Sequence, residues 1–528
     1  MHNHSDQFPD VPSRIERLGC YSGLYSTEAR VFYPETVDHV REVFQFAKEN
    51  GCRVTIRGGA HAFDAQSLGD DLVISMMGFK QIEVDVGARR LRVGPGRTWG
   101  EIVAALAPVG LMPAVTVTTS HATAGGTLAG DCLSRFSPAY GKEGTKVKSF
   151  DMVTPEGNLL VCTPPDSGVP PAQWTPEEHA FSGVIGGLGY LGAVTAITYE
   201  VLRVNKPGPI RIATSVTRCP TFEKLVEELV PIAHQTDLDP SDPNNYELPD
   251  SIYAGLHAGR FGGQSALLFT SRVDPGRERR RLLLHRPRLW LRVPAEWILR
   301  SWVGEWALWR LFYGLVNTKK DYVDDLADYT FFMDGNVRAK HAGKKLFRRK
   351  MQTIQQTFVV PGDAKDESTW SDTQNNLLEW LRYAHGVLRG RKVAPTMHDV
   401  MYLPADDRFP LSATAELAGF AVSYAFETSS KRKLRKIKAS FEEMSAHLWQ
   451  SFQGRVYLVK NVHADPQVLR DMYYPHAIRF FTVKHQLDPH CILRNEFLDR
   501  TFEALLQCTP LPTPPAQVGR PAAAQPTA

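Results

Sequence analysis

The sequence is poor in cysteine and lacks long apolar stretches. Seven cysteines occur in 528 residues, and no two of them form a CxxC pair. An odd, scattered set predicts neither a disulfide framework nor a zinc knuckle, and it favours a reducing compartment. No apolar run of about eighteen uncharged residues occurs, and the opening MHNHSDQFPDVPSR lacks the apolar core of a signal peptide. We therefore expect a cytoplasmic protein, with membrane contact left open.

Several common functional motifs are also missing. The chain contains no HExxH, no GxSxG and no GKS or GKT, so it lacks the signatures of zinc proteases, serine hydrolases and P-loop proteins. The formal net charge of +4 is small for a chain of this length. Without a concentrated basic patch, this charge gives no reason to expect nucleic-acid binding.

The composition is that of a folded globular protein. Hydrophobic residues make up 43% and charged residues 22% of the chain, both close to ordinary usage. A chain of 528 residues exceeds what one hydrophobic core usually organises, so two or three packed units are expected.

The region up to about residue 204 alternates short helical and strand patterns. HVREVFQFAKENG has helical spacing and leads into the β-rich RVTIR, and WGEIVAALAPVG (99–110) predicts a second helix that ends at Gly110. Short alternating runs at 72–76, 82–87 and 91–96 predict strands, and residues 150–162 predict a hairpin that turns at Glu156 and Gly157. This pattern is typical of an α+β domain.

The pattern changes near residue 205, where a second unit begins. Within it, residues 279–320 contain five of the ten tryptophans together with many arginines and leucines. A buried helical pair with arginines at its edge is favoured slightly over a basic amphipathic surface that lies on a membrane or covers an apolar substrate. The tail beyond Thr509 is rich in proline and alanine and is expected to be disordered.

Two glycine-rich segments dominate the first unit. They read RGGAH at 57–61 and TTSHATAGGT at 118–127. Small residues let main-chain N–H groups converge on an anionic group, so together the two segments could hold one pyrophosphate. Because GxGxxG opens a helix in neither segment, a dinucleotide bound by a fold other than the Rossmann fold is predicted.

The order of these features resembles a known family. The entry helix and strand, RGGAH, GPGRTWGEI, TAGGTLAGD and IGGLGYLGAVTAITYEV follow one another as in the FAD-binding domain of the vanillyl-alcohol oxidase superfamily, the p-cresol methylhydroxylase (PCMH) type. The resemblance is greatest to the decaprenylphosphoryl-ribose oxidase and aldonolactone or alditol oxidase branch. Residues 326–361, 454–461 and 487–500 resemble the substrate domain of that branch.

This resemblance implies an α+β fold in two main parts. A two-part PCMH-type FAD-binding domain at 20–204 would be followed by a substrate domain with an antiparallel sheet at 205–505, which contains the tryptophan-rich insert. Residues 1–19 would form an N-terminal extension and 506–528 a disordered tail.

The resemblance also implies which residues bind FAD. The first loop would wrap the pyrophosphate and approach the flavin ring, the second loop would cover the other side of the phosphates, and Val194 would bind adenine through its main chain. The implied cofactor-binding residues are Ile56, Arg57, Gly58, Gly59, Ala60, His61, Ala62, Phe63, Gln66, Thr118, Thr119, Thr123, Ala124, Gly125, Gly126, Gly130, Asp131, Cys132, Leu133, Val194 and Tyr457.

His61 has two alternative roles in this scheme. It occupies the position at which members of the superfamily bond FAD covalently, and it could instead donate only a hydrogen bond to the ring. The covalent alternative is favoured, because Arg57 to His61 match the attachment motif. A second, cysteine-linked bond is not expected, because no cysteine lies between Cys52 and Cys132.

Lys460 and Tyr457, in RVYLVKN, match the positions that face the flavin from the substrate domain. Oxidation of an alcohol requires a base or a cation near the hydroxyl, and a desolvated lysine can act as either. Lys460, Tyr457 and His61 are therefore the candidate catalytic residues, although Lys460 could also be an ordinary surface lysine of a strand.

The expected activity is FAD-dependent oxidation of a C–OH or C–H bond in a sugar-derived, lipid-linked or secondary-metabolite substrate. The electron acceptor would be O₂ or another oxidant. Two alternatives stay open, a flavin-dependent C=C reductase of the sterol-reductase type and a flavin-binding membrane-surface protein without turnover. The stretch after the second loop, CLSRFSP (132–138), lacks the histidines of the decaprenylphosphoryl-ribose enzymes, so a pentose-phosphate lipid is not indicated as substrate. Arg135 could supply a cation in their place.

Overall fold

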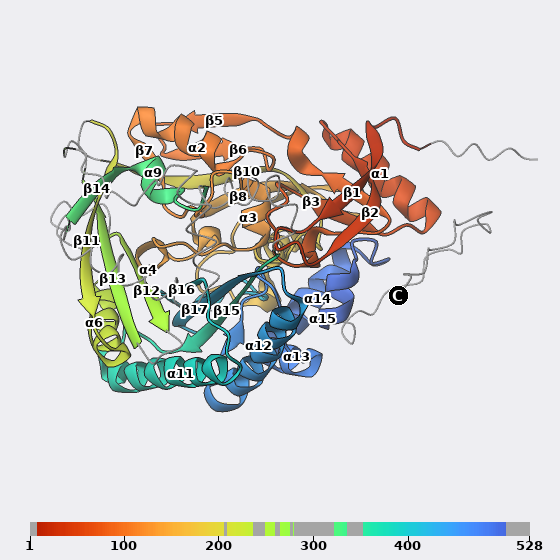
Figure 1. Cartoon of the computed structure of the whole chain (residues 1–528). Coiled ribbons are helices and arrows are strands. Elements are labelled where there is room, and N and C mark those ends of the chain that lie inside the picture. The colour runs from red at the N-terminus through yellow and green to blue at the C-terminus, as the bar shows by residue number, and fades with distance from the viewer. Residues whose placement is uncertain are drawn as a thin grey trace, which may run out of the picture.

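The computed structural model describes residues 8–204, 208–235, 249–258, 264–274, 278, 321–334 and 352–502. The tryptophan-rich segment 279–320 and the predicted disordered tail lie outside these residues, so the predictions made for them are not addressed. In the described part of the chain, three β-sheets and the helices packed on them form the structure (Figure 1).

The first sheet is small and mostly parallel. Strands β2, β4 and β3 run parallel to one another, and β1 joins the edge of β2 in antiparallel orientation. The elements are β1 (Ser13–Gly19), β2 (Ser26–Phe32), α1 (Val37–Asn50), β3 (Val54–Arg57), η1 (Ala65–Ser67), β4 (Leu72–Ser75) and η2 (Met76–Gly78). Helix α1 is capped by the Thr36 side chain at its start and by Gly51, in the left-handed region, at its end. Part of the predicted N-terminal extension is therefore a strand of this sheet.

The second sheet is antiparallel in its described pairs and follows in the chain. Its order is β5-β6-β10-β8-β9, with β7 also paired to β10. The elements are β5 (Ile82–Asp85), β6 (Arg90–Val93), α2 (Trp99–Leu106), η3 (Ala107–Val109), β7 (Leu111–Pro113), α3 (Ala124–Ala129), α4 (Ser137–Tyr140), η4 (Glu143–Lys146), β8 (Val147–Val153), β9 (Leu159–Cys162), η5 (Pro171–Gln173), α5 (Pro176–Val184) and β10 (Ala193–Arg203).

The third sheet belongs to the second half of the chain. Its order is β14-β11-β13-β12-β16-β17-β15-β18, with antiparallel pairing throughout its described strands. The elements are β11 (Arg211–Cys219), α6 (Phe222–His234), β12 (Ser251–Ala258), β13 (Gln264–Val273), β14 (Asp321–Asp325), α9 (Leu326–Thr330), β15 (Gln352–Pro361), η7 (Glu367–Thr369), α11 (Trp370–Gly390), β16 (Met397–Leu403), β17 (Gly419–Thr428), α12 (Lys431–Phe452) and β18 (Arg455–Val456).

The two faces of the third sheet have different neighbours. Helices α6, α11 and α12 cover one face with an apolar core that includes Trp380, Phe358 and Phe441 (Figure 1). The other face lies toward the first half of the molecule, where α4 contacts β12 and β16. A cavity lies between this face and the first half of the molecule.

The last described helices return to the first sheet. These are α13 (Pro466–Tyr473), α14 (His476–Leu487) and α15 (Glu496–Phe502). The Val54 N–H donates to the Ile492 carbonyl at 2.7 Å, and the Asn495 amide donates to the Gln66 carbonyl at 3.0 Å. The segment 492–495 therefore contacts both strand β3 and the loop that contains Gln66.

The structure confirms the predicted α+β class and the main elements of the first unit. The predicted helices correspond to α1 and α2, with Gly110 in the left-handed region after the second, and the predicted hairpin corresponds to β8 and β9. The cysteine prediction was partly wrong. Cys20, Cys52, Cys132, Cys162 and Cys219 are free thiols, but Cys491 is disulfide-bonded.

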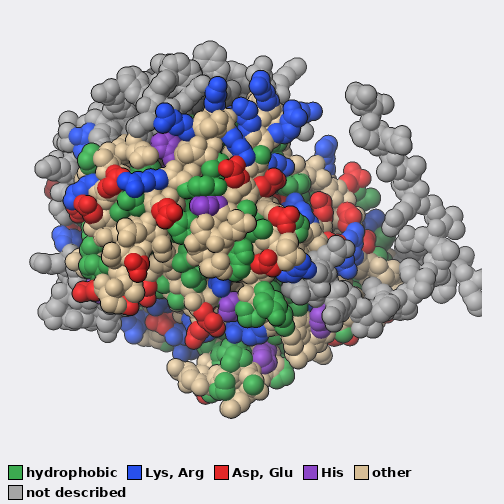
Figure 2. Space-filling model, turned by 90° about the horizontal axis from the view of Figure 1, so that it is seen from below, with side chains coloured by type: hydrophobic (Ala, Val, Ile, Leu, Met, Phe, Trp, Pro, Cys, Tyr) green, Lys and Arg blue, Asp and Glu red, His purple; other side chains and the backbone are tan. Residues whose placement is uncertain are grey.

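The described surface shows no single dominant charge on the face in Figure 2. Acidic and basic side chains are mixed over most of this face, and lysines and arginines gather along one border. Among the described helices, none is both long enough and apolar enough to cross a bilayer.

Candidate functional site

A cavity of about 560 Å³ lies between the first half of the molecule and the third sheet. This size is within the range of roughly 300–1,000 Å³ that is common for small-molecule sites. Both glycine-rich segments, the stretch after α3 and the segment 457–460 line it together. The sequence predicted that these four segments meet, although about 400 residues separate the first from the last.

The two glycine-rich loops pack directly against each other, with the Thr123 side chain between them. The Gly59 N–H donates to Thr123 Oγ1 at 3.2 Å. A Cβ at Gly58 would lie 2.6 Å from Thr123 Oγ1, and one at Gly59 would lie 2.9 Å from the His121 carbonyl oxygen. Side chains at these glycines would separate the loops, so glycine is needed here for close approach.

Helix α3 is held equally close to the loop after β6. The Gly125 N–H donates to the Pro95 carbonyl at 3.0 Å, and a Cβ at Gly125 would lie 2.5 Å from the Pro95 Cβ. Below α3, the Trp99 indole N–H donates to Thr127 Oγ1, which in turn donates to Glu143 Oε1 at 3.0 Å. This buried network fixes α3 at the edge of the cavity.

The segment 130–133 forms part of the cavity wall and is anchored from both halves. The Tyr457 hydroxyl lies 3.1 Å from the Gly130 carbonyl oxygen and 3.2 Å from that of Asp131. The Asp131 carboxylate forms an ion pair with the buried Lys142 ammonium, which also pairs with Asp406 of the second half at 2.8 Å. Asp131 therefore holds the two halves together, and its side chain does not line the cavity.

The segment 457–461 is fixed by residues of the first loop. The Gln66 side-chain amide donates to the carbonyl oxygens of Leu458 (2.7 Å) and Lys460 (3.0 Å). The Asn461 amide donates to the Phe63 carbonyl at 2.9 Å. These bonds hold Lys460 against the loop that carries His61.

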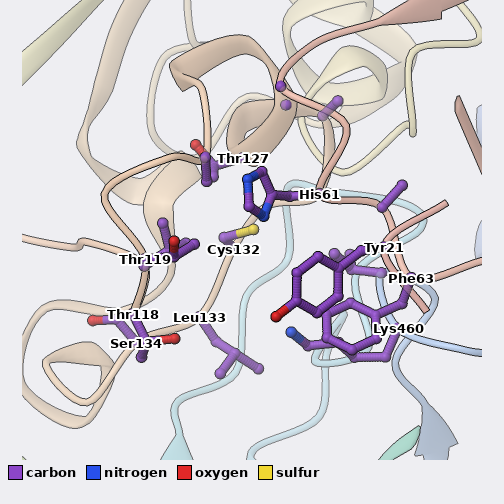
Figure 3. Close-up of a pocket in the computed structure, with 18 of the residues that line it drawn as sticks. Tyr21, His61, Phe63, Thr118, Thr119, Thr127, Cys132, Leu133, Ser134 and Lys460 are labelled. Carbon is purple, nitrogen blue, oxygen red and sulfur yellow. The ribbon is translucent and has the colours of Figure 1, made fainter. Parts of the chain in front are cut away.

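His61 lies in the first loop and lines the cavity. The preceding Ala60 has φ 63°, a left-handed conformation that is uncommon for a residue with a Cβ. The His61 ring stacks with Tyr21 at 5.5 Å and with His121 at 6.3 Å between ring centroids. Figure 3 shows this ring between the second loop on one side and Tyr21 on the other.

Lys460 lines the same cavity from the second half. Its ammonium lies 4.4 Å from the centre of the Phe63 ring, and Figure 3 shows both side chains beside Tyr21. Burial disfavours the charged form and lowers the pKa of Lys460, although the Cys132 thiol and the Asp399 carboxyl partly oppose this shift. No carboxylate of the described chain lies within ion-pair distance of its ammonium.

Nearly all of the predicted cofactor-binding residues line the cavity. The exceptions are Arg57, Ala124 and Asp131, which do not line it. The Arg57 guanidinium donates to the carbonyl oxygens of Ser67 and Gly19, so this side chain supports the first loop from outside. Tyr457 lines the cavity, and its hydroxyl is directed to the backbone of 130–131.

The wall contributed by the third sheet was missing from the predicted site. It includes polar, aromatic and methionine side chains from neighbouring strands: Tyr253, Phe269, Tyr322, Gln355, Thr357, Met397, Asp399, Met401 and Ser423. Tyr21, Arg135, Phe332 and Met333 also line it. Alternation along these strands was the only available signal, and it does not show which face is turned to a ligand.

Comparison with known proteins agrees with this geometry. Residues 29–163 match the family described as FAD binding domain. The chain is 27% identical over 197 residues to decaprenylphosphoryl-β-D-ribose oxidase of Mycolicibacterium smegmatis, which covers 37% of this chain and 40% of that protein. It is 24% identical over 203 residues to cytokinin dehydrogenase 9 of Oryza sativa subsp. japonica (36% and 35%). It is 26% identical over 181 residues to (R)-6-hydroxynicotine oxidase of Paenarthrobacter nicotinovorans (34% and 37%).

These alignments cover 40% or less of the length of each of the three relatives. The size of the cavity and the close approach of the two glycine loops that line it fit a dinucleotide. The first part of the chain is a PCMH-type FAD-binding domain, the type found in the vanillyl-alcohol oxidase superfamily of flavoproteins. FAD is its cofactor.

Proposed function

We propose that this protein oxidises a C–OH or similar C–H bond of a sugar-derived, lipid-linked or secondary-metabolite substrate. The position of Lys460 supports this proposal most directly, because its ammonium lies in the cavity beside the loop that carries His61. FAD, when bound, supplies the acceptor for the hydride that leaves the substrate carbon. The final electron acceptor would be O₂ or another oxidant.

Lys460 would act on the substrate hydroxyl. A lowered pKa increases the fraction of neutral amine, which can accept the hydroxyl proton. In its charged form, the same group would stabilise an alkoxide. Tyr457 would act by position, since its hydroxyl contacts the carbonyl oxygens of Gly130 and Asp131 and so fixes the wall near Lys460.

The proposal is tested by flavin reduction under anaerobic conditions. Polyols, lactones, glycosyl lipids and aromatic alcohols would be screened for bleaching of the flavin absorbance, and the active substrate then used with variants. We expect Lys460→Met to slow reduction by about 10²- to 10⁴-fold, the usual contribution of a general base. The exposed Lys80 provides the matched control, Lys80→Met. An unchanged rate in Lys460→Met would remove Lys460 from the mechanism, and a purified chain without flavin would contradict the whole proposal.

His61 would bond FAD covalently in this protein. Its place in the cavity and the left-handed Ala60 that presents it support this assignment. After acid precipitation, we expect the yellow colour to stay with the protein pellet and to move to the supernatant in His61→Ala. His121→Ala, which changes the neighbouring ring, should leave the colour in the pellet. Colour in the supernatant of the unmodified protein would show that His61 does no more than contact the cofactor.

A further inference from the structure

Arg135 is a buried cation in the wall of the cavity. It follows α3 in the chain, only 8% of its surface is exposed, and it lines the cavity together with residues of the third sheet. A charged group in such a place costs free energy unless a partner of opposite charge or several hydrogen bonds compensate for its lost hydration.

Aromatic rings surround its guanidinium. The guanidinium carbon lies 3.9 Å from the centre of the Tyr253 ring and 3.7 Å from that of Phe332. The Tyr253 ring is itself stacked on Phe269, with centroids 4.6 Å apart and planes inclined by 3°. The Tyr329 hydroxyl accepts a hydrogen bond from this guanidinium. Cation–π packing occupies the flat face of a guanidinium, and its five N–H donors are more than one tyrosine hydroxyl can accept, so donors on its edge are left for a further acceptor.

No carboxylate in the described part of the chain forms an ion pair with Arg135. Asp399 also lines the cavity, and its Oδ1 has no hydrogen-bond partner. Burial raises the pKa of this carboxyl, while a hydrogen bond with Ser423 and the charges of Arg135 and Lys460 oppose the shift. Asp399 is therefore a weak counter-ion for two cations that face the same space.

We infer that the substrate carries a carboxylate that binds to Arg135 while its oxidisable carbon lies near Lys460. This inference rests on the proposed function and names the class of substrate. The aromatic rings beside Arg135 would contact the apolar body of such a hydroxy acid, and the planar guanidinium edge matches a carboxylate with two parallel hydrogen bonds.

A carboxylate fits this wall better than a phosphate group. Arg135 and Lys460 are the cations that line the described cavity, and Lys460 is held against the first loop through its own backbone. The lining around Arg135 also includes aromatic rings, methionine side chains and the Asp399 carboxyl. One guanidinium held among aromatic rings balances the single charge of a carboxylate, whereas a doubly charged phosphate would require further donors.

Binding of simple acids to the FAD-loaded protein tests the inference. Benzoate and hexanoate would be titrated by calorimetry beside their neutral amides and beside phenylphosphonate. We expect at least one carboxylate to bind about tenfold or more tightly than its amide, since a hydrogen bond to a charged group is lost in the amide. Arg135→Met should weaken that carboxylate about 10- to 100-fold and leave the amide unchanged, and Arg135→Lys should retain part of the preference. Arg17→Met, on exposed β1, is the matched control.

Three results would overturn the inference. These are carboxylate binding by Arg135→Met with the original affinity, equal binding of acid and amide, and tighter binding of phenylphosphonate than of either carboxylate. If Arg135→Met does not fold, Arg135→Lys replaces it in the test. Lysine cannot form two parallel hydrogen bonds with a carboxylate, so an acid affinity and an acid-over-amide preference equal to those of the unmodified protein would also overturn the inference. A failure here leaves flavin content and flavin reduction intact, which separates it from a failure of the proposed function.

Discussion

At the scale of single residues, Lys460 shows how the environment decides what a common side chain can do. The sequence also allowed Lys460 to be a solvated lysine on a strand. In the structure it lines a cavity and lies beside Phe63. The backbone of Lys460 is held by Gln66, and its pKa is lowered because burial disfavours the ammonium. Position and protonation are therefore both set by neighbours that lie far away in the sequence.

The pH dependence of flavin reduction follows from this pKa. If neutral Lys460 accepts the substrate proton, the rate should rise with pH and level off below 10.5, the ordinary value for lysine. Lys460→Arg, whose guanidinium stays charged, should move any remaining rise to higher pH and reduce the plateau. Anaerobic stopped-flow measurements between pH 6 and 10 would show this. A pH-independent rate in the unmodified protein would assign Lys460 to charge stabilisation alone.

At the scale of elements, α3 depends on a buried acid beneath it. Glu143 is 2% exposed and accepts hydrogen bonds from Thr127 (3.0 Å) and Tyr199 (2.6 Å). Burial is the main cause that raises the pKa of Glu143 to about 8, and the two hydrogen bonds only partly oppose it. Near neutral pH, this side chain is therefore mostly protonated in the folded protein.

This raised pKa predicts that the protein loses stability as pH rises from 4.5 to about 8. The unfolded chain releases the proton near its ordinary value of 4.5, while the folded protein keeps it up to about pH 8. Glu143 therefore makes its full contribution to the free energy of unfolding below pH 4.5. This contribution is lost as pH rises to 8, by at most roughly 1.4 kcal/mol per pH unit.

Glu143→Gln should remove this dependence, because glutamine keeps the acceptor oxygen and cannot ionise. Urea unfolding at pH 5 and pH 8.5 would measure the difference in free energy of unfolding between the variant and the unmodified protein. We expect the variant to gain relative stability at the higher pH. An equal difference at both values would contradict the assignment of a protonated Glu143.

The elements around the cofactor were predictable from sequence to different extents. Helix α1 has apolar positions at helical spacing and is capped by Thr36 at its start and Gly51 at its end, and both signals are local in the sequence. The glycine loops also carried a local signal, because glycines crowd where backbones approach. The wall formed by Tyr253, Asp399 and Ser423 carried none, since three strands that are far apart in the chain are brought together only by the order of the third sheet.

At the scale of the whole molecule, the two halves are joined by buried polar contacts around the cavity. Asn461 has no exposed surface, donates to the Phe63 carbonyl at 2.9 Å and accepts from the Gln355 N–H at 3.0 Å. Gln66, Tyr457 and Lys142 make further bonds across the same boundary. The cofactor cavity therefore depends on the packing of one half on the other.

Replacing Asn461 with alanine should weaken this boundary. The change leaves the Phe63 carbonyl and the Gln355 N–H without partners, and each buried polar group left unpaired costs about 1–3 kcal/mol. We expect a lower free energy of unfolding by that order and faster loss of any flavin that is not covalently bound. Thermal unfolding and flavin release by gel filtration would measure both effects. Asn50→Ala, at the exposed end of α1, should change neither, and equal effects of the two substitutions would contradict a specific role for Asn461.

The return of residues 491–495 to the first sheet has a consequence for the order of assembly. Val54 pairs with Ile492, and Asn495 bonds to the loop that contains Gln66. During synthesis, the first cofactor loop leaves the ribosome long before its last supporting residues exist. The loop can thus reach its final form only after nearly the whole described chain has been made, and firm capture of the flavin becomes one of the last events in the maturation of the protein.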